Sequence, residues 1–200
     1  MDGRHFVKIA GEELLPRIIR QFSEWADVSV ATNDPNIAAQ VKGTHIVKPA
    51  KVKGYYGVDL VRKGLELHTR ERTIIVFGDV YFTEQAVACI KKGNNRSWAV
   101  YGRKTGNDYK RYGEYFAFEL ASRLLPRARE AVEKVRDKWV AKEWYRCTPW
   151  EWYYEMEGMS WRIKRYDHVP TGPHWVNIKD LTDDIDMAQD AWNLNHRLRA

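Results

Sequence analysis

The feature that most constrains the fold of this 200-residue chain is the alternation of helical and extended patterns along its first half. Between Glu12 and Ala26, apolar residues recur at the spacing of an amphipathic helix, and Pro16 lies near its start, where a missing N–H costs little. Further helices are expected at 35–40 and about 58–67, with strands at 28–31, 45–47 and 73–77. Such alternation predicts an α/β protein with a mostly parallel sheet flanked by helices.

The second half continues these patterns less regularly. Thr83 is expected to cap a helix that runs to about Lys92. Later helices are predicted over about 119–140, with an irregularity at Pro126, over 149–156, and from about 187 onward. Strands are predicted at 98–102, 115–118, 161–163 and 175–178. Because no repeat or linker interrupts the pattern, we expect one domain over residues 1–200.

Composition favours a globular protein of a reducing compartment. The longest strongly apolar stretch, Thr73 to Phe77, is far shorter than the roughly 20 residues that cross a bilayer, and no charged-then-apolar leader opens the chain. Cys89 and Cys147 lack metal-type partners at short spacing, so two ordinary thiols and a cytoplasmic location are expected. The formal charge of +6 suits an anionic partner such as a nucleotide, a phosphorylated acceptor or nucleic acid.

Two acidic features are candidates for a metal site. Asp79 follows the predicted strand 73–77, and Gly78 beside it permits a close approach of ligand and backbone at the carboxyl end of that strand. Alternatively, Asp79 simply caps a turn. A denser acidic patch follows the last predicted strand and consists of Asp180, Asp183, Asp184 and Asp186. Its carboxylates suit Mg²⁺ or Mn²⁺, although acidic residues also favour the start of a helix through its dipole.

Four segments resemble motifs of one family, in the same order along the chain. They are residues 6–15 (FVKIAGEELL), 77–82 (FGDVYF), 113–118 (GEYFAF) and 182–190 (TDDIDMAQD). They resemble, respectively, the stretch after the family's signature lysine, the strand with its metal aspartate, a segment near the acceptor, and an acidic motif before the final helix. The family is that of the sugar-phosphate and phosphocholine nucleotidyltransferases, in the nucleotide-diphospho-sugar transferase superfamily. The resemblance implies a Rossmann-like sheet of the type found in that superfamily.

The start of the chain departs from this pattern. The family opens with a strand and a Gly-rich loop that wraps the nucleotide phosphates with backbone N–H groups. Here only residues 1–4 (MDGR) precede the matching segment, so the sequence lacks the first strand and most of that loop. Gly3 and Arg4 are then a shortened remnant of the loop, or Arg4 stands where the family has its signature lysine.

The resemblance implies transfer of a nucleotidyl group from a nucleoside triphosphate to a phosphorylated small-molecule acceptor, with release of pyrophosphate. By this resemblance Asp79, Asp184 and Asp186 hold Mg²⁺ or Mn²⁺, while Lys179 and Arg4 are candidate catalytic residues. The implied nucleotide contacts are Gly3, Gly54, Tyr55 and Gly78. Lys179 is otherwise a solvated charge, and the loop around Gly54 is otherwise an ordinary Gly-containing loop.

Aromatic and basic residues gather in an aromatic-basic segment at about 139–168. They suit core packing, a homodimer contact or an acceptor pocket, since aromatic rings contribute large buried area and also stack on sugars, bases or cations. The six histidines show no metal-ligand spacing. Two other functions stay open: a glycosyltransferase of the same fold that uses a sugar nucleotide, and a catalytically impaired nucleic-acid-binding or scaffold protein.

Overall fold

A computed structural model describes residues 3–32, 34–41, 45–47, 57–68, 71–93, 97–105, 112–162 and 171–199. Its longer helices are α1 (Leu14–Ser23), α2 (Pro35–Gln40), α3 (Gly57–Glu66), α4 (Glu84–Lys92), α5 (Leu125–Val140), α6 (Pro149–Glu157) and α7 (Ala188–Arg197). The 3₁₀ turns η1 (Gly3–Phe6) and η2 (Ser122–Leu124) accompany them. Over the described ranges, no helix combines the length and the apolar character that a membrane crossing requires.

Ten strands form the sheets of the described residues. In chain order they are β1 (Lys8–Ile9), β2 (Glu12–Glu13), β3 (Ser29–Ala31), β4 (His45–Val47), β5 (Arg72–Val76), β6 (Val80–Tyr81), β7 (Trp98–Thr105), β8 (Tyr112–Ala121), β9 (Trp175–Asn177) and β10 (Asp183–Asp184). The largest sheet has the order β5-β8-β7-β9. Strand β8 is antiparallel to both neighbours and β7 is parallel to β9, so β5, β7 and β9 share one direction. A separate parallel pair joins β3 to β4. The mixed α/β fold with a mostly parallel sheet is thus confirmed.

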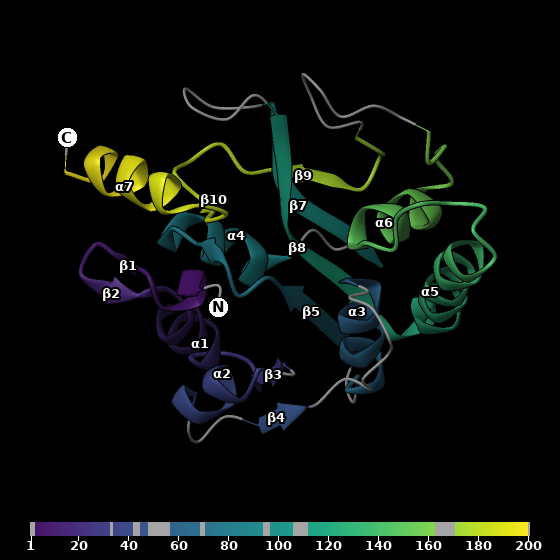
Figure 1. Cartoon of the computed structure of the whole chain (residues 1–200), viewed down its shortest axis with the longest axis horizontal. Helices are drawn as coiled ribbons and strands as arrows, with labels where there is room; N and C mark the ends of the chain where they lie inside the picture. Colours follow the sequence, from purple (N-terminus) through teal and green to yellow (C-terminus); the bar gives the residue numbers. More distant parts are fainter. Residues whose placement is uncertain are drawn as a thin grey trace.

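Helices cover both faces of this sheet. Figure 1 shows α1, α4 and α7 on one side of the strands and α3, α5 and α6 on the other. Side chains alternate along β7 accordingly, because successive residues of a strand point to opposite faces. Ala99 and Tyr101 join the core on the α1/α4/α7 face, whereas Trp98 and Val100 join the core on the α3/α5/α6 face.

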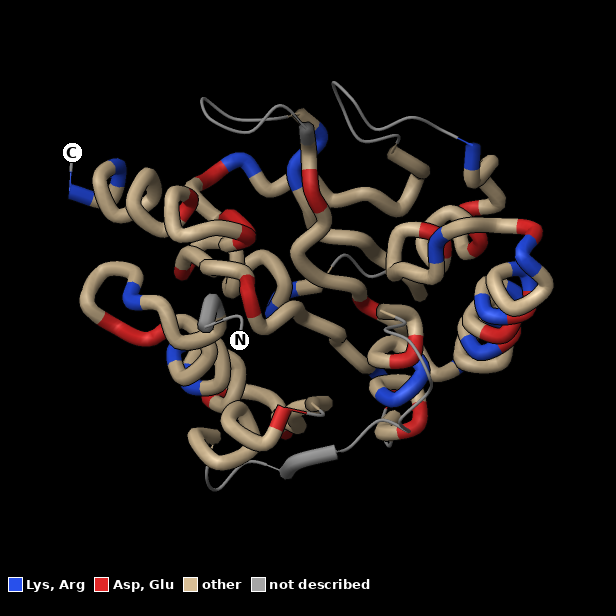
Figure 2. Tube along the Cα trace, viewed as in Figure 1, with Lys and Arg blue, Asp and Glu red and all other residues tan. Residues whose placement is uncertain are grey.

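The aromatic segment contributes mainly to the second of these cores. Trp152 and Tyr153 are 0% exposed, and Trp150 and Tyr154 are also buried on α6. Thr148 caps this helix within a capping box that includes Glu151. Core packing therefore accounts for the aromatic residues of α6. Figure 2 shows that α5, which packs beside α6, carries alternating basic and acidic residues along its length.

Several predicted boundaries are wrong. The helix predicted from Glu119 begins only at Leu125, because the chain from Glu119 to Ala121 is still paired with β5. Pro126 lies in the first turn of α5, where its ring fixes a helical φ angle, instead of interrupting the helix. The predicted strand at 161–163 is also wrong, since Trp161 and Arg162 form a turn and residue 163 lies outside the described part of the chain.

Candidate active site

A short strand pairing brings the two acidic motifs together. Strand β10 is antiparallel to β6, with Asp183 opposite Tyr81 and Asp184 opposite Val80. Immediately beyond this pair, the Ile185 N–H donates a 2.7 Å hydrogen bond to the Asp79 carbonyl oxygen. Ile185 is 1% exposed and anchors the contact in the core. The predicted motifs at 77–82 and 182–190 are therefore neighbours in space, as their resemblance to one family implies.

Three carboxylates form a compact group at this place. Glu114, Asp184 and Asp186 each have an oxygen that lies within 4.8 Å of an oxygen of the other two. Glu114 is buried on β8, Asp184 is half-buried on β10, and Asp186 is exposed. Hard divalent cations prefer such oxygen ligands and keep waters in their remaining positions. The donor set and its open side therefore fit Mg²⁺ or Mn²⁺.

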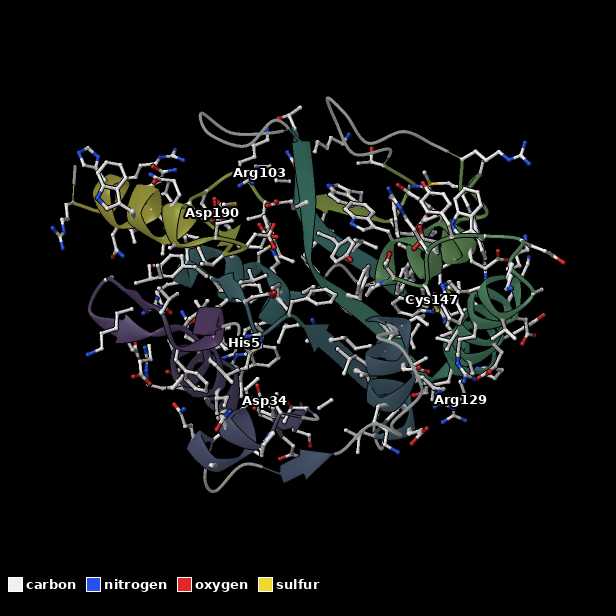
Figure 3. All side chains as sticks on the ribbon, in the orientation of Figure 1. His5, Asp34, Arg103, Arg129, Cys147 and Asp190 are labelled. Carbon is white, nitrogen blue, oxygen red and sulfur yellow. The ribbon has the colours of Figure 1, made fainter. Side chains whose placement is uncertain are left out.

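Arg103 holds the buried part of this group in place. Its Nη2 atom lies 3.0 Å from Glu114 Oε2 and 3.0 Å from Asp183 Oδ1, and its Nη1 donates to the Thr182 carbonyl oxygen at 3.2 Å. Arg103 and both carboxylates are at most 9% exposed. Figure 3 labels Arg103 beside β8, on the side of the sheet that faces α7. The Arg103 guanidinium thus forms ion pairs with two buried carboxylates from distant segments of the chain.

A glycine permits this close arrangement. A Cβ atom on Gly113 would lie 2.1 Å from the Arg103 carbonyl oxygen, a distance that no side chain can occupy. Strands β7 and β8 therefore approach closely at the residue before Glu114. This position fixes the backbone from which the Glu114 carboxylate reaches Arg103.

A cavity of about 310 Å³ is lined by Arg103 and Asp183, which form an ion pair beside the carboxylate group, but not by Glu114, Asp184 or Asp186 themselves. Arg103, Lys179 and Arg197 supply positive charge to its wall, together with Asp180 and Asp183. Asp180 joins the loop before β10 to the start of α4, because it accepts hydrogen bonds from Thr83 Oγ1 at 2.6 Å and from the Thr182 N–H at 2.8 Å. The cavity can take a small anionic group near Arg103, Lys179 and Arg197.

Comparisons with known proteins identify solved structures with a similar fold. No protein-family model and no curated protein matches the sequence. Among solved structures, a putative glucose-1-phosphate thymidylyltransferase from Bacillus anthracis aligns with a TM-score of 0.60 and 9% identity, over 98% of this chain and 86% of that chain. The 2-C-methyl-D-erythritol 4-phosphate cytidylyltransferase from Thermus thermophilus aligns with a TM-score of 0.55 and 13% identity, over 100% of this chain and 96% of that chain. HddC from Yersinia pseudotuberculosis aligns with a TM-score of 0.53 and 9% identity, over 98% of this chain and 89% of that chain.

The chain shares the fold of these three solved structures. At these identities the likeness establishes the fold alone. Within this fold, the carboxylate group lies where strands β5 and β9 end and β8 begins, so it occupies the carboxyl edge of the parallel strands. Ligands of open α/β sheets bind at that edge.

The other predicted site residues lie around or outside the compact carboxylate group. Asp79 is half-buried and lies next to Ile185 through its backbone, but the compact carboxylate group has Glu114 as its third member. Lys179 is exposed on the cavity wall. Gly3 and Arg4 lie in η1, while the Arg4 side chain, Gly54 and Tyr55 lie outside what the structure describes.

Gly78 is approached by protein side chains. A Cβ atom there would lie 3.4 Å from both His5 Nδ1 and Leu15 Cδ1. Both distances are ordinary van der Waals contacts, so the N-terminal turn η1 and helix α1 pack against the Gly78-Asp79 turn. A nucleotide contact of Gly78 stays a prediction.

Sequence reasoning missed two members of the site. Arg103 and Lys104 follow one another after the apolar start of β7, and no local pattern shows that Arg103 is the buried one of the two. Glu114 belongs to a segment that the resemblance placed near the acceptor, yet no local pattern marked it as a neighbour of Asp184. The pairing depends on the register of β7, β8 and β10, which the sequence does not display.

Proposed function

We propose that the protein is a metal-dependent nucleotidyltransferase that moves a nucleotidyl group from a nucleoside triphosphate to a phosphorylated small-molecule acceptor and releases pyrophosphate. The observation that carries this proposal is the group of Glu114, Asp184 and Asp186, which Arg103 links to a cavity with Lys179 and Arg197 on its wall. Solved nucleotidyltransferases with the same fold, one of them HddC complexed with GMP-PN, add support.

The reaction needs positioning and charge neutralisation more than covalent chemistry. An acceptor phosphate oxygen attacks the α-phosphorus of the triphosphate. The bond from that phosphorus to the bridging oxygen breaks, and the oxygen leaves with its electron pair as part of pyrophosphate. The acceptor oxygen is already ionised at neutral pH, so no general base is required.

The residues of the chain have separate tasks in this scheme. Glu114, Asp184 and Asp186 would hold Mg²⁺ or Mn²⁺, with Asp79 as a further carboxylate from the neighbouring turn. When bound, this ion supplies positive charge against the phosphates. Lys179, together with Arg197, lies where it can contact phosphate oxygens at the mouth of the cavity. Arg103 acts as a positioning residue, because its bonds to Glu114 and Asp183 fix the carboxylates.

The remaining assignments are also proposals. Cys89 and Cys147 are free thiols, which agrees with our placing the enzyme in the reducing cytoplasm. A homodimer stays a prediction. The identity of the nucleotide and of the acceptor is to be found by experiment.

The test begins with Mn²⁺ binding, measured by electron paramagnetic resonance. Asp184→Asn and Glu114→Gln should each weaken Mn²⁺ binding by about tenfold or more, because each removes one charged oxygen ligand. Glu24→Gln, which changes an exposed carboxylate at the C-terminal end of α1, is the matched control. Thermal unfolding of all variants separates loss of metal from loss of fold.

Turnover is then measured as pyrophosphate release with each common triphosphate and a panel of sugar phosphates and phosphorylated alcohols. We expect one pair to react only when Mg²⁺ or Mn²⁺ is present. Turnover of a sugar nucleotide without pyrophosphate release would instead favour a glycosyltransferase. Unchanged Mn²⁺ binding in both carboxylate variants would refute the metal site.

A further inference from the structure

A second cavity lies on the other side of the molecule from the candidate active site. It has a volume of about 580 Å³ and lies between the carboxyl-terminal half of α5 and the segment that follows α6. The charged and aromatic residues that line it are Lys134, Lys138, Glu143, Trp144, Glu155, Trp161 and Arg162. This volume lies within the range of about 300–1,000 Å³ that is usual for small-molecule sites. The nucleotidyltransferase chemistry proposed above uses none of these residues.

Two indole rings form a corner of this cavity. The ring centroids of Trp144 and Trp161 are 6.0 Å apart, and the ring planes are at 77° to each other. Lys138 Nζ lies 4.4 Å from the centroid of Trp161, so the ammonium group is held against the ring by a cation–π contact. Neither indole lies in the fully buried core, in contrast to Trp152 and its neighbours on α6. The corner thus holds aromatic surface that the fold itself does not bury.

The Trp144 indole also has an unused donor. Its Nε1 atom is shielded from solvent and has no hydrogen-bond partner in the described part of the chain. An unpaired buried donor costs free energy, and indole N–H groups normally find an acceptor when they are buried. A ligand oxygen in the cavity would satisfy this donor once a rotation of the indole turns Nε1 towards the cavity.

The charges around the cavity are mixed. Lys134 and Glu155 form an ion pair with each other. The other three charged groups on the wall are Lys138, Arg162 and Glu143, so donors and acceptors alternate around the indoles. The hydroxyl groups of a sugar both donate and accept hydrogen bonds, and its C–H faces pack against aromatic rings.

We propose that this cavity is a carbohydrate-binding site for an unphosphorylated pyranose ring. The ring packs against the Trp144 and Trp161 corner, one hydroxyl accepts from Trp144 Nε1, and the others bond to Lys138, Glu143 and Glu155. The site is separate from the carboxylate group, because the sheet and α6 stand between the α5 end and β10 (Figure 1). It would let the protein bind a glycan, or a sugar product, independently of nucleotidyl transfer.

The experiment uses saturation-transfer NMR on the full chain with the methyl glycosides of D-glucose, D-galactose, D-mannose, N-acetyl-D-glucosamine and D-glucuronate. Triphosphate is omitted and EDTA is present, so the outcome does not depend on the proposed transferase activity. At least one glycoside should bind. Trp161→Ala should weaken its binding by about tenfold through lost ring packing, and Trp144→Phe by about fivefold through loss of the N–H together with part of the ring surface.

The matched control is Trp192→Ala, which removes an indole that is 63% exposed on α7. It should bind the sugar like the wild type. Thermal unfolding shows which variants remain folded, and Trp144→Phe keeps a ring in place if Trp161→Ala does not fold. Absence of binding for every glycoside, or binding that both variants leave unchanged, would overturn the proposal. So would a salt-sensitive affinity for a labelled ten-nucleotide oligo(dT) that requires Trp161, because it would assign the cavity to single-stranded nucleic acid.

Discussion

Both faces of the central sheet bury aromatic residues, but the two faces differ in the groups that are packed most tightly there. On the α3/α5/α6 face, the ring planes of Trp98 and Phe118 stack at 4° with centroids 5.7 Å apart, and Trp152 stands perpendicular to both. On the α1/α4/α7 face, Arg103, Glu114 and Asp183 are buried at the edge of the core. Buried rings gain free energy from leaving water, whereas buried charges first lose hydration and regain it only through good partners. We therefore expect the aromatic face to contribute most of the stability and the charged face to position the site.

The largest expected effect comes from the aromatic face. Trp152→Ala should lower the free energy of unfolding by about 4 kcal/mol, since it opens a large cavity and breaks the 3.0 Å hydrogen bond from Trp152 Nε1 to the Ala128 carbonyl oxygen. Urea unfolding followed by circular dichroism measures this loss. Mn²⁺ binding by the variant should stay unchanged under conditions in which it is folded.

The control for this change is a tryptophan of the same kind outside the core. Trp192→Ala should alter the free energy of unfolding by at most about 0.5 kcal/mol. An equal loss for both tryptophan variants would show that the α6 aromatics do not dominate stability, and the contrast between the faces would fail.

The charged face should respond differently. Arg103→Met should destabilise the fold by about 3 kcal/mol, because it leaves Glu114 and Asp183 buried without their shared partner. Unlike Trp152→Ala, it should also disturb the metal site, since Glu114 loses the bond that fixes it. Urea unfolding and Mn²⁺ titration of the same samples measure both effects.

Lys104→Met tests whether charge alone explains this result. Lys104 is the next residue on β7 but has an exposed side chain, so its removal should leave both measurements near those of the wild type. If Arg103→Met lowers the free energy of unfolding no more than Lys104→Met does, the buried ion pairs contribute little to stability, and Arg103 has no positioning role.

Most of the helices and strands could be predicted because their signals are local. The apolar spacing of α1, the Thr83 cap of α4 and the β-prone run of β5 each lie within a few neighbouring residues. Errors arose where a distant partner decides the structure. Glu119 has helical neighbours in sequence, but its carboxylate pairs with Arg72 at 2.8 Å and accepts a hydrogen bond from the Tyr101 hydroxyl, which holds it in β8.

The candidate site divides in the same way. Asp184 and Asp186 could be found because a dense acidic run after a strand is visible in the sequence. Glu114 and Arg103 are single residues on two other strands, and only the register of β7, β8 and β10 brings them beside that run. Their partnership therefore required the structure.

The smallest expected effect concerns the two thiols, one on each face. Cys147 packs against α3 and α5 in the aromatic core and is 6% exposed (Figure 3), whereas Cys89 on α4 is half-buried. Burial, reinforced by the charge of Asp59, raises the pKa of the Cys147 thiol to about 12, and burial also raises the pKa of Cys89. A raised thiol pKa means that the folded state favours the protonated thiol. The contribution of this thiol to the free energy of unfolding is therefore fully present below the ordinary thiol pKa and is lost as the pH rises towards 12. At pH 8, below the ordinary thiol pKa, titration of the two thiols should therefore leave the free energy of unfolding unchanged, and the two cysteines should differ only in their reactivity.

A thiol reagent such as Ellman's reagent should modify Cys89 first and Cys147 at a rate limited by opening of the core, since the thiolate is the reactive form. Stopped-flow absorbance on the single variants Cys89→Ser and Cys147→Ser assigns the two phases, and the same reaction in urea gives the rate for exposed thiols. Equal and rapid modification of both cysteines in the folded protein would mean that the aromatic face opens as readily as the charged one.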